Sequence, residues 1–183
     1  MAGRVIIFPT DTVYGIGTKI FDKEGIKRIY EIKNRPLDKP LACLCYDLEQ
    51  IKSIAYTDDK TIKLINKFLP GPLTLILKAK EEVYNTIGYK TIGVRIPNSK
   101  IALDILHENG PMLTTSVNES GYTPLNEYDE IVNKYSNIVD YIYPSNEKSS
   151  NLSSTVIMAI DEIKILRVGE ISLNDINKTL GLE

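Results

Sequence analysis

The chain has 183 residues, 43% of them hydrophobic and 25% charged, with a formal net charge of -2 at pH 7. This size and composition are typical of a globular protein, and we predict a single domain over residues 1–183. The slight negative charge argues against a protein that wraps duplex nucleic acid, but it leaves room for a local basic cavity. No apolar run approaches the ~20 residues of a membrane-spanning helix, so we expect a cytoplasmic protein.

The first predicted strand, at residues 5–8, is a β-branched and aromatic run that ends at Pro9. The polar stretch 9–17, Pro-Thr-Asp-Thr-Val-Tyr-Gly-Ile-Gly, follows it. Its glycines Gly15 and Gly17 permit close approach of the backbone to a ligand. The alternative is a turn held by local side-chain hydrogen bonds. Neither a third glycine nor a GxxxxGK loop is present, so the standard nucleotide-binding loops are excluded.

A cationic turn follows the first predicted helix, which Asp22 is placed to cap. Residues 33–40 read Lys-Asn-Arg-Pro-Leu-Asp-Lys-Pro and bring Lys33, Arg35 and Lys39 together on a segment punctuated by two prolines. A guanidinium beside ammonium groups matches the oxygens of a phosphate. Most short charge runs are solvated surface loops, so this turn alone does not decide the function.

Strands at residues 41–45 and 73–77 flank a predicted helix at 58–69. Thr74 in the second strand is either an edge hydroxyl or part of a pocket wall.

The two cysteines, Cys43 and Cys45, lie in the first of these strands. In an apolar run of a cytosolic protein they are expected to be small core residues. One histidine and two cysteines do not supply the four ligands of a structural zinc site without carboxylates. We therefore predict no metal site built from protein side chains alone.

Arg95 lies in an otherwise apolar strand at residues 91–96. Burying an unpaired guanidinium is unfavourable, so Arg95 is expected to find an anion or an exposed strand end. Asn98 or Ser99 then caps a helix that runs through His107. The position of His107 near the end of that helix favours an interaction with the helix dipole over a catalytic role.

The strand that begins at Met112 runs into a polar loop. Along a strand, Ser116 and Asn118 share one face while Val117 points to the other. Two uncharged hydrogen-bonding side chains at a strand end suit a ligand, and they suit a turn almost as well.

The remaining elements are a helix at 126–135, a strand at 139–143, a hairpin of strands at 156–160 and 163–166, and a last helix that begins at Ser172. Alternating strands and helices without repeats predict one mixed α/β domain.

The polar positions that stand out are cations and small hydroxyls, mostly at strand ends or on the turns after strands. Open α/β sheets bind ligands at such places. This inventory favours an anionic substrate whose reaction is promoted by positioning and charge neutralisation, rather than a Ser-His-Asp triad or a carboxylate pair. The residues are Thr10, Thr12, Lys33, Arg35, Lys39, Arg95, Ser116, Asn118, Ser154, Thr155 and Arg167.

From about Val5 to Gly169 the chain resembles the YrdC-like family of threonylcarbamoyl-AMP synthases, in its short, single-domain form. Each motif is weak alone, but seven in the same order form a specific signal. They are residues 9–17, Lys33-x-Arg35-Pro36, residues 70–74, residues 93–97, residues 115–118 with Ser120-Gly121, residues 154–156 and Leu166-Arg167.

The resemblance implies a twisted, mixed α/β sheet flanked by helices and curled around a basic cavity. It implies a nucleotidyltransferase that joins L-threonine, bicarbonate and ATP, with Mg²⁺, into threonylcarbamoyl-AMP and releases pyrophosphate. A downstream tRNA threonylcarbamoyl transferase complex would use that product to modify tRNA beside the anticodon, and weak RNA binding by the synthase itself is a further expectation.

The resemblance also implies roles for individual residues. Lys33 and Arg35 would be catalytic, by relieving the charge of the reacting anions. ATP would be bound by Arg35, Lys39, Thr91, Asn118, Asn126 and Arg167. Threonine would be held by Thr12, Arg95, Ser116 and Ser154, with Arg95 on its carboxylate.

Four positions depart from the family pattern: Val117, Leu44, Lys39 and Met158 replace a usual alanine, histidine, asparagine and aspartate. Two rival functions are a domain of a carbamoyl-transferring hydrogenase-maturation protein and a non-catalytic RNA-binding module. The first normally belongs to long chains with zinc-finger-like cysteines, which this sequence lacks. The second would bind RNA in a strongly salt-dependent way without any need for threonine.

Overall fold

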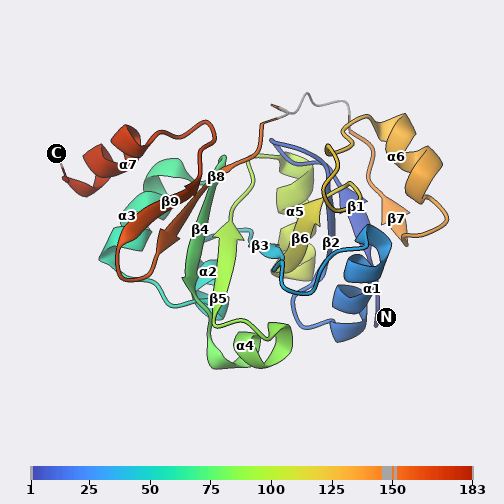
Figure 1. The fold of residues 1–183 in the computed structure, drawn as a ribbon, viewed down its shortest axis with the longest axis horizontal. Coiled ribbons are helices and arrows are strands. Elements are labelled where there is room, and N and C mark those ends of the chain that lie inside the picture. The colour runs from blue at the N-terminus through green and yellow to red at the C-terminus, as the bar shows by residue number, and fades with distance from the viewer. Residues whose placement is uncertain (1, 146–149, 151, 183) are drawn as a thin grey trace.

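The computed structural model describes residues 2–145, 150 and 152–182, and nine strands within them form one mixed sheet (Figure 1). The strand order is β7-β1-β2-β6-β3-β5-β4-β8-β9, which interleaves strands from both halves of the chain. The strands are β1 (Ile6–Phe8), β2 (Gly15–Lys19), β3 (Ala42–Leu44), β4 (Leu73–Lys78), β5 (Thr91–Arg95), β6 (Met112–Ser116), β7 (Tyr141–Ile142), β8 (Thr155–Ala159) and β9 (Ile163–Arg167).

Seven helices of the described residues flank this sheet, which confirms the predicted fold class. Short polar side chains start most of them, because a side-chain oxygen at the first position satisfies a free backbone N–H. Asp22 accepts from the N–H of Gly25, and Ser99 accepts from that of Ala102. The helices are α1 (Lys23–Lys33), α2 (Leu48–Ile54), α3 (Asp59–Phe68), α4 (Glu81–Ile87), α5 (Lys100–Asn109), α6 (Tyr128–Tyr135) and α7 (Leu173–Leu180).

Three elements were not predicted from the sequence. α2 and α4 are short helices, and α4 has no side-chain cap at its start, so the sequence offers little signal for it. β2 contains two glycines, which are poor strand residues. A Cβ on Gly15 would lie 2.6 Å from Cγ2 of Thr114, so glycine lets β2 pair closely with β6. Gly15 thus lies close to a neighbouring strand, and it also lines the cavity described below.

Alternate residues of β4 point to opposite faces of the sheet, as the pleat requires. Leu73, Leu75 and Leu77 are buried in the main hydrophobic core, whereas Thr74 and Ile76 line a cavity. The neighbouring strands β3, β5 and β8 alternate in the same way. One face of the sheet thus holds the core, and the other holds a polar cavity.

Helix α5 covers part of the cavity-bearing face. Its residues Ala102 and Ile105 pack in a second apolar cluster with Phe8 of β1 and Met112 of β6. Ser116 lies on the same side of β6 as Met112 and lines the cavity. The cavity therefore begins where the cover of α5 ends.

The predicted hairpin at the end of the sheet is present: β9 pairs antiparallel with β8, and β8 pairs parallel with β4. Cys43 and Cys45 are free and buried in the main core, as expected. A helix long and apolar enough to cross a membrane does not occur among the described residues.

Candidate active site

A cavity of about 320 Å³ opens on the face of the sheet beside α5. Seven of the residues predicted for the site line it, although they come from distant parts of the chain. Four do not line it: Lys33, Lys39, Asn118 and Asn126. The seven that do are Thr12, Arg35, Thr91, Arg95, Ser116, Ser154 and Arg167.

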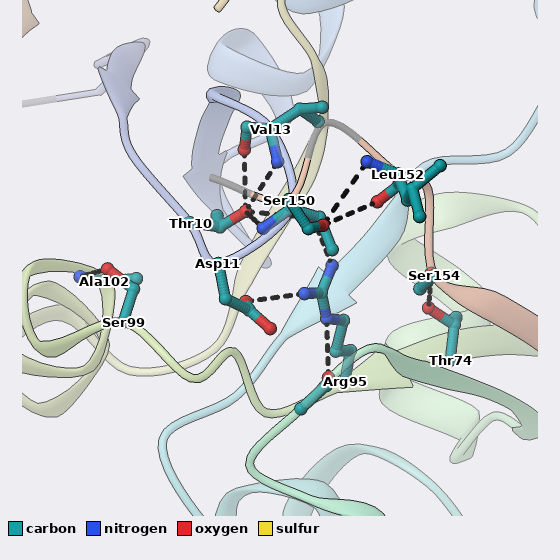
Figure 2. A network of polar contacts seen from close by, with 12 residues as sticks. Thr10, Asp11, Val13, Thr74, Arg95, Ser99, Ala102, Ser150, Leu152 and Ser154 are labelled. Atoms are coloured by element: carbon teal, nitrogen blue, oxygen red, sulfur yellow. Dashed lines mark hydrogen bonds and ion pairs between the residues drawn. The ribbon is translucent and has the colours of Figure 1, made fainter. Parts of the chain in front are cut away.

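Arg95, at the end of β5, is the most deeply buried cation of the cavity wall, with 6% of its surface exposed (Figure 2). Its Nη2 forms an ion pair with Oδ1 of Asp11 at 2.6 Å, and its Nη1 donates to Oγ1 of Thr12 at 2.8 Å. Its Nε donates to the carbonyl of Gly71 at 3.0 Å. The expected anionic partner of Arg95 is thus Asp11, a residue for which the sequence predicted no role.

The turn that carries Asp11 and Thr12 is held by its own side chains, as one of the two sequence interpretations proposed. Thr10 Oγ1 donates to the carbonyl of Val13 at 2.6 Å and accepts from the N–H groups of Thr12 and Val13. It also lies 3.1 Å from Thr12 Oγ1. This local network fixes the hydroxyl of Thr12 toward Arg95 and the cavity.

Arg35 also lines the cavity and lies in the cationic turn. Its Nε donates to the carbonyl of Lys39 at 2.9 Å, and its Nη2 donates to that of Pro40 at 3.0 Å. Tyr30 Oη donates to the same carbonyl of Lys39 at 3.0 Å. The turn therefore folds back on Arg35 and aims its guanidinium through local contacts. The side chain of Lys39 is exposed and lies outside the cavity wall.

Ser154, just before β8, is contacted from two sides. Arg167 at the end of β9 donates to the Ser154 carbonyl from Nε at 3.0 Å and to its Oγ from Nη2 at 3.1 Å. Thr74 Oγ1 lies 2.8 Å from the same Oγ (Figure 2). A Cβ on Gly169 would lie 2.6 Å from the carbonyl oxygen of Ser153, so only glycine allows the chain after Arg167 to pass this close.

Lys33 lies behind the wall rather than in it. Its Nζ, on a residue only 1% exposed, donates to the carbonyl oxygens of Ser116 and Asn118 and to Asn118 Oδ1. Burial, and then the positive charge of Arg35, lowers the pKa of Lys33 to about 8. The ammonium group thus holds the strand end that presents Ser116 to the cavity.

The side-chain amide of Asn118 forms hydrogen bonds within the same segment. Its Oδ1 accepts from Lys33 and from Ser116 Oγ at 2.6 Å, and its Nδ2 donates to the carbonyls of Glu119 and Tyr122. Ser116 and Asn118 do share one face, as predicted. Asn126 accepts from the N–H of Tyr14 through Oδ1 at 3.0 Å and likewise lies outside the cavity wall.

The cations of the cavity differ in how they are neutralised. Among the described residues, Arg35 and Arg167 donate to neutral oxygens and form no ion pair, whereas Arg95 is paired with Asp11. Partial burial, and then the charge of Arg95, lowers the pKa of Arg167. Two guanidinium groups without counter-ions give the cavity an affinity for a polyanion.

Some cavity residues were missed by sequence reasoning, among them Ala42 and Ile76. Strand alternation would have found Ala42 and Ile76, since they point away from the core. Of the four departures, Leu44 lines the cavity and Val117 is buried in the core on the opposite face. Thr74 proves to be part of the cavity wall, which settles the choice between its two interpretations.

The chain is similar in sequence to one family of known proteins. The Sua5/YciO/YrdC family model, described as telomere recombination, matches residues 1–169. A candidate threonylcarbamoyl-AMP synthase of Methanocaldococcus jannaschii is 36% identical over 168 residues, covering 92% of this chain and 80% of that protein.

Two solved structures are close in fold. Pyrococcus abyssi Sua5 complexed with L-threonine has a TM-score of 0.89 and 33% identity, covering 98% of this chain but only 54% of that one. Escherichia coli YciO has a TM-score of 0.85 and 31% identity, covering 95% of this chain and 87% of that one. The chain therefore spans about half the length of the Pyrococcus protein and most of the length of YciO. The extent of the family match and these identities show that the chain belongs to the Sua5/YciO/YrdC family.

Proposed function

We propose that this protein synthesises L-threonylcarbamoyl-AMP from L-threonine, bicarbonate and ATP, with release of pyrophosphate, for the threonylcarbamoyladenosine modification of tRNA. The observation that carries the proposal is the cavity itself. It joins a buried guanidinium flanked by hydroxyls, which suits an amino acid, to two guanidinium groups that form no ion pair within the described part of the chain, which suit a triphosphate. The relatives named as threonylcarbamoyl-AMP synthases, and the threonine held by Pyrococcus abyssi Sua5, support the same function.

The chemistry needs positioning and charge neutralisation more than a strong base. The amine of threonine attacks the carbon of bicarbonate, water leaves, and the resulting carbamate is already an anionic nucleophile. The carbamate oxygen attacks the α-phosphorus of ATP, the bond from that phosphorus to the bridging oxygen breaks, and pyrophosphate leaves with its electron pair. Both reactants are anions, so cations must hold them together. Arg35 and Arg167, which both line the cavity, are suited to this role.

Arg95 is suited to the carboxylate of threonine. A guanidinium has five N–H groups, and three of those of Arg95 are used by Gly71, Thr12 and Asp11. Two N–H groups are left for a carboxylate without disrupting the ion pair. Ser154 would provide a hydroxyl beside it, and Ser116, whose hydrogen goes to Asn118, would offer threonine its oxygen as an acceptor. Thr91 would contact ATP. For Lys33 and Asn118 we propose a role in positioning Ser116.

Mg²⁺ would enter with ATP, bound by the phosphates, and would help neutralise their charge. The described residues contain no group of three or more His, Cys, Asp or Glu side chains placed to hold a metal ion. The side-chain donors of the cavity are guanidiniums and hydroxyls, which suit the phosphates rather than the metal.

Other parts of the proposal concern the setting of the reaction. We propose that residues 1–183 act as one domain, because a single sheet takes strands from Ile6 to Arg167. The product would pass to a tRNA threonylcarbamoyl transferase complex in the cytoplasm. Weak RNA binding by the synthase would be recognised by a steep decrease in affinity as salt is raised.

The deciding experiment measures pyrophosphate release from α-labelled ATP, with threonine and bicarbonate each omitted in turn. We expect turnover and a labelled threonylcarbamoyl-AMP product only when all three substrates are present. Pyrophosphate release that continues without threonine would contradict the proposed function.

A further inference from the structure

Thr74 lines the cavity and contacts Ser154, a proposed threonine ligand, but has no assigned role itself. It lies on β4, next to β8, and its side chain is directed to the cavity face together with that of Ser154. The two residues are only 7% and 5% exposed. Their oxygens lie 2.8 Å apart, and Arg167 Nη2 donates to the Ser154 oxygen at 3.1 Å.

The hydrogens of this cluster can be counted. A serine hydroxyl has one hydrogen and two acceptor positions, and a guanidinium only donates. Arg167 therefore occupies one acceptor position of Ser154. A threonine carboxylate beside Ser154 carries no hydrogen, so Ser154 must donate its single hydrogen to the substrate. Ser154 then has none left for Thr74, and Thr74 must donate to the second acceptor position of Ser154.

We propose that Thr74 is a positioning residue of the threonine subsite, whose hydroxyl donates to Ser154 and thereby turns the Ser154 hydrogen toward the substrate carboxylate. This inference rests on the proposed function. With both Arg167 and Thr74 donating to it, the Ser154 hydroxyl is polarised and becomes a stronger donor, because hydrogen bonds in a chain reinforce one another. Without Thr74, Ser154 is free to rotate its hydrogen away.

The test replaces Thr74 by valine, which has the same shape without the hydroxyl. We expect T74V to raise the KM for threonine about tenfold. This is the usual effect of losing one hydrogen bond to a charged group, here the bond from Ser154 to the substrate carboxylate. The KM for ATP should stay within about twofold, because removing one neutral hydroxyl beside Ser154 leaves the guanidinium charges in place. T74S, which restores the hydroxyl, should restore the KM for threonine.

A binding measurement separates positioning from a merely structural role. Titration calorimetry should show weaker binding of L-threonine to T74V than to the wild type. L-threoninamide, which lacks the carboxylate, should bind both proteins equally. The matched control is T18V, because Thr18 is a fully buried threonine on β2 whose hydroxyl donates to the Arg4 carbonyl at 2.7 Å, away from the cavity. It should leave the KM for threonine unchanged. T74A gives the same comparison if valine perturbs folding.

The outcomes are distinct. If the wild type shows threonine-dependent turnover but T74V and T74A have its KM for threonine, the role of Thr74 is overturned while the proposed function stands. An equal loss of threoninamide binding would also overturn it, because a general disturbance of the cavity would then explain the effect. If the wild type itself shows no threonine-dependent turnover, the proposed function fails and the inference fails with it.

Discussion

Two arginines that line the cavity, Arg95 and Arg35, are held in contrasting ways. Arg95 is buried and is fixed by Asp11, Thr12 and Gly71, residues far from it in the chain. Arg35 is partly exposed and is fixed by the carbonyls of Lys39 and Pro40, four and five residues away.

The difference separates two kinds of preorganisation. The wall around Arg95 exists only in the folded sheet, so its geometry and the stability of the protein depend on the same contacts. The guanidinium of Arg35 is held by carbonyls of its own turn, and Tyr89 Oη adds one bond from outside, to the Leu37 carbonyl of that turn. We therefore expect substitutions at Arg95 to affect folding and activity together, and substitutions at Arg35 to affect activity alone.

The largest expected effect is that of Arg95→Met. Removing one partner of a buried ion pair leaves the other uncompensated, so the free energy of unfolding should fall by about 3 kcal/mol. Threonine-dependent turnover should also be lost. Urea denaturation and pyrophosphate release measure the two effects. The double variant D11N/R95M removes both charges and should regain part of the stability but none of the turnover. If R95M were as stable as the wild type, the contacts of Arg95 would not contribute to folding, contrary to our expectation.

Arg35→Ala should have the opposite profile. Its guanidinium makes only local contacts near the surface, so the free energy of unfolding should change by less than about 0.5 kcal/mol. Turnover should fall about 100-fold, as expected when one preorganised donor to a developing charge is removed. Pyrophosphate release at saturating ATP and threonine tests this. A large loss of stability in R35A would show that folding depends on the contacts of Arg35.

The same contrast explains what the sequence could predict. Most strands, the capped helices α1, α3, α5 and α7, and the residues of the Lys-x-Arg turn are local features, and they were identified from spacing, residue type and capping side chains. β2 was missed because Gly15 and Gly17 are poor strand residues on their own, and their strand is maintained by pairing with β1 and β6. Tertiary context decided that element.

Within the site, residue types were easier to predict than partners. Arg95 does have the anionic partner that its burial requires, but nothing local identifies Asp11, 84 positions away, as that anion. Lys33 was expected to contact a substrate because of its charge. Its long side chain instead reaches three oxygens of the Ser116–Asn118 segment, a contact that only the folded protein creates.

A pH dependence of turnover would extend the comparison to Lys33. Below its pKa of about 8, lowered by burial and by Arg35, Nζ has three hydrogens for its three oxygen partners. As the pH rises above 8, Nζ loses a proton and faces one of those oxygens with a lone pair. Turnover should then fall, approaching about tenfold per pH unit if the protonated form alone is active.

Side-chain NMR of labelled lysines provides the independent check of that pKa. One lysine should titrate near pH 8, and its signal should be absent from Lys33→Met. If every lysine titrates near its ordinary pKa of about 10.4, this interpretation of Lys33 is wrong.

The smallest expected effect is that of Tyr30→Phe, which tests whether the position of Arg35 depends on the hydroxyl of Tyr30. The substitution removes only the hydroxyl that donates to the Lys39 carbonyl, while Arg35 Nε keeps its own bond to that oxygen. Losing one such hydrogen bond is worth about 1 kcal/mol, so the KM for ATP should rise about fivefold. The KM for threonine should not change, because Arg95 and Ser154 are untouched.

The matched control is Tyr84→Phe, because Tyr84 is an exposed residue of α4 outside the cavity wall. If Y30F keeps the wild-type KM for ATP, then the two bonds that Arg35 makes to its own turn are sufficient to hold its guanidinium in place.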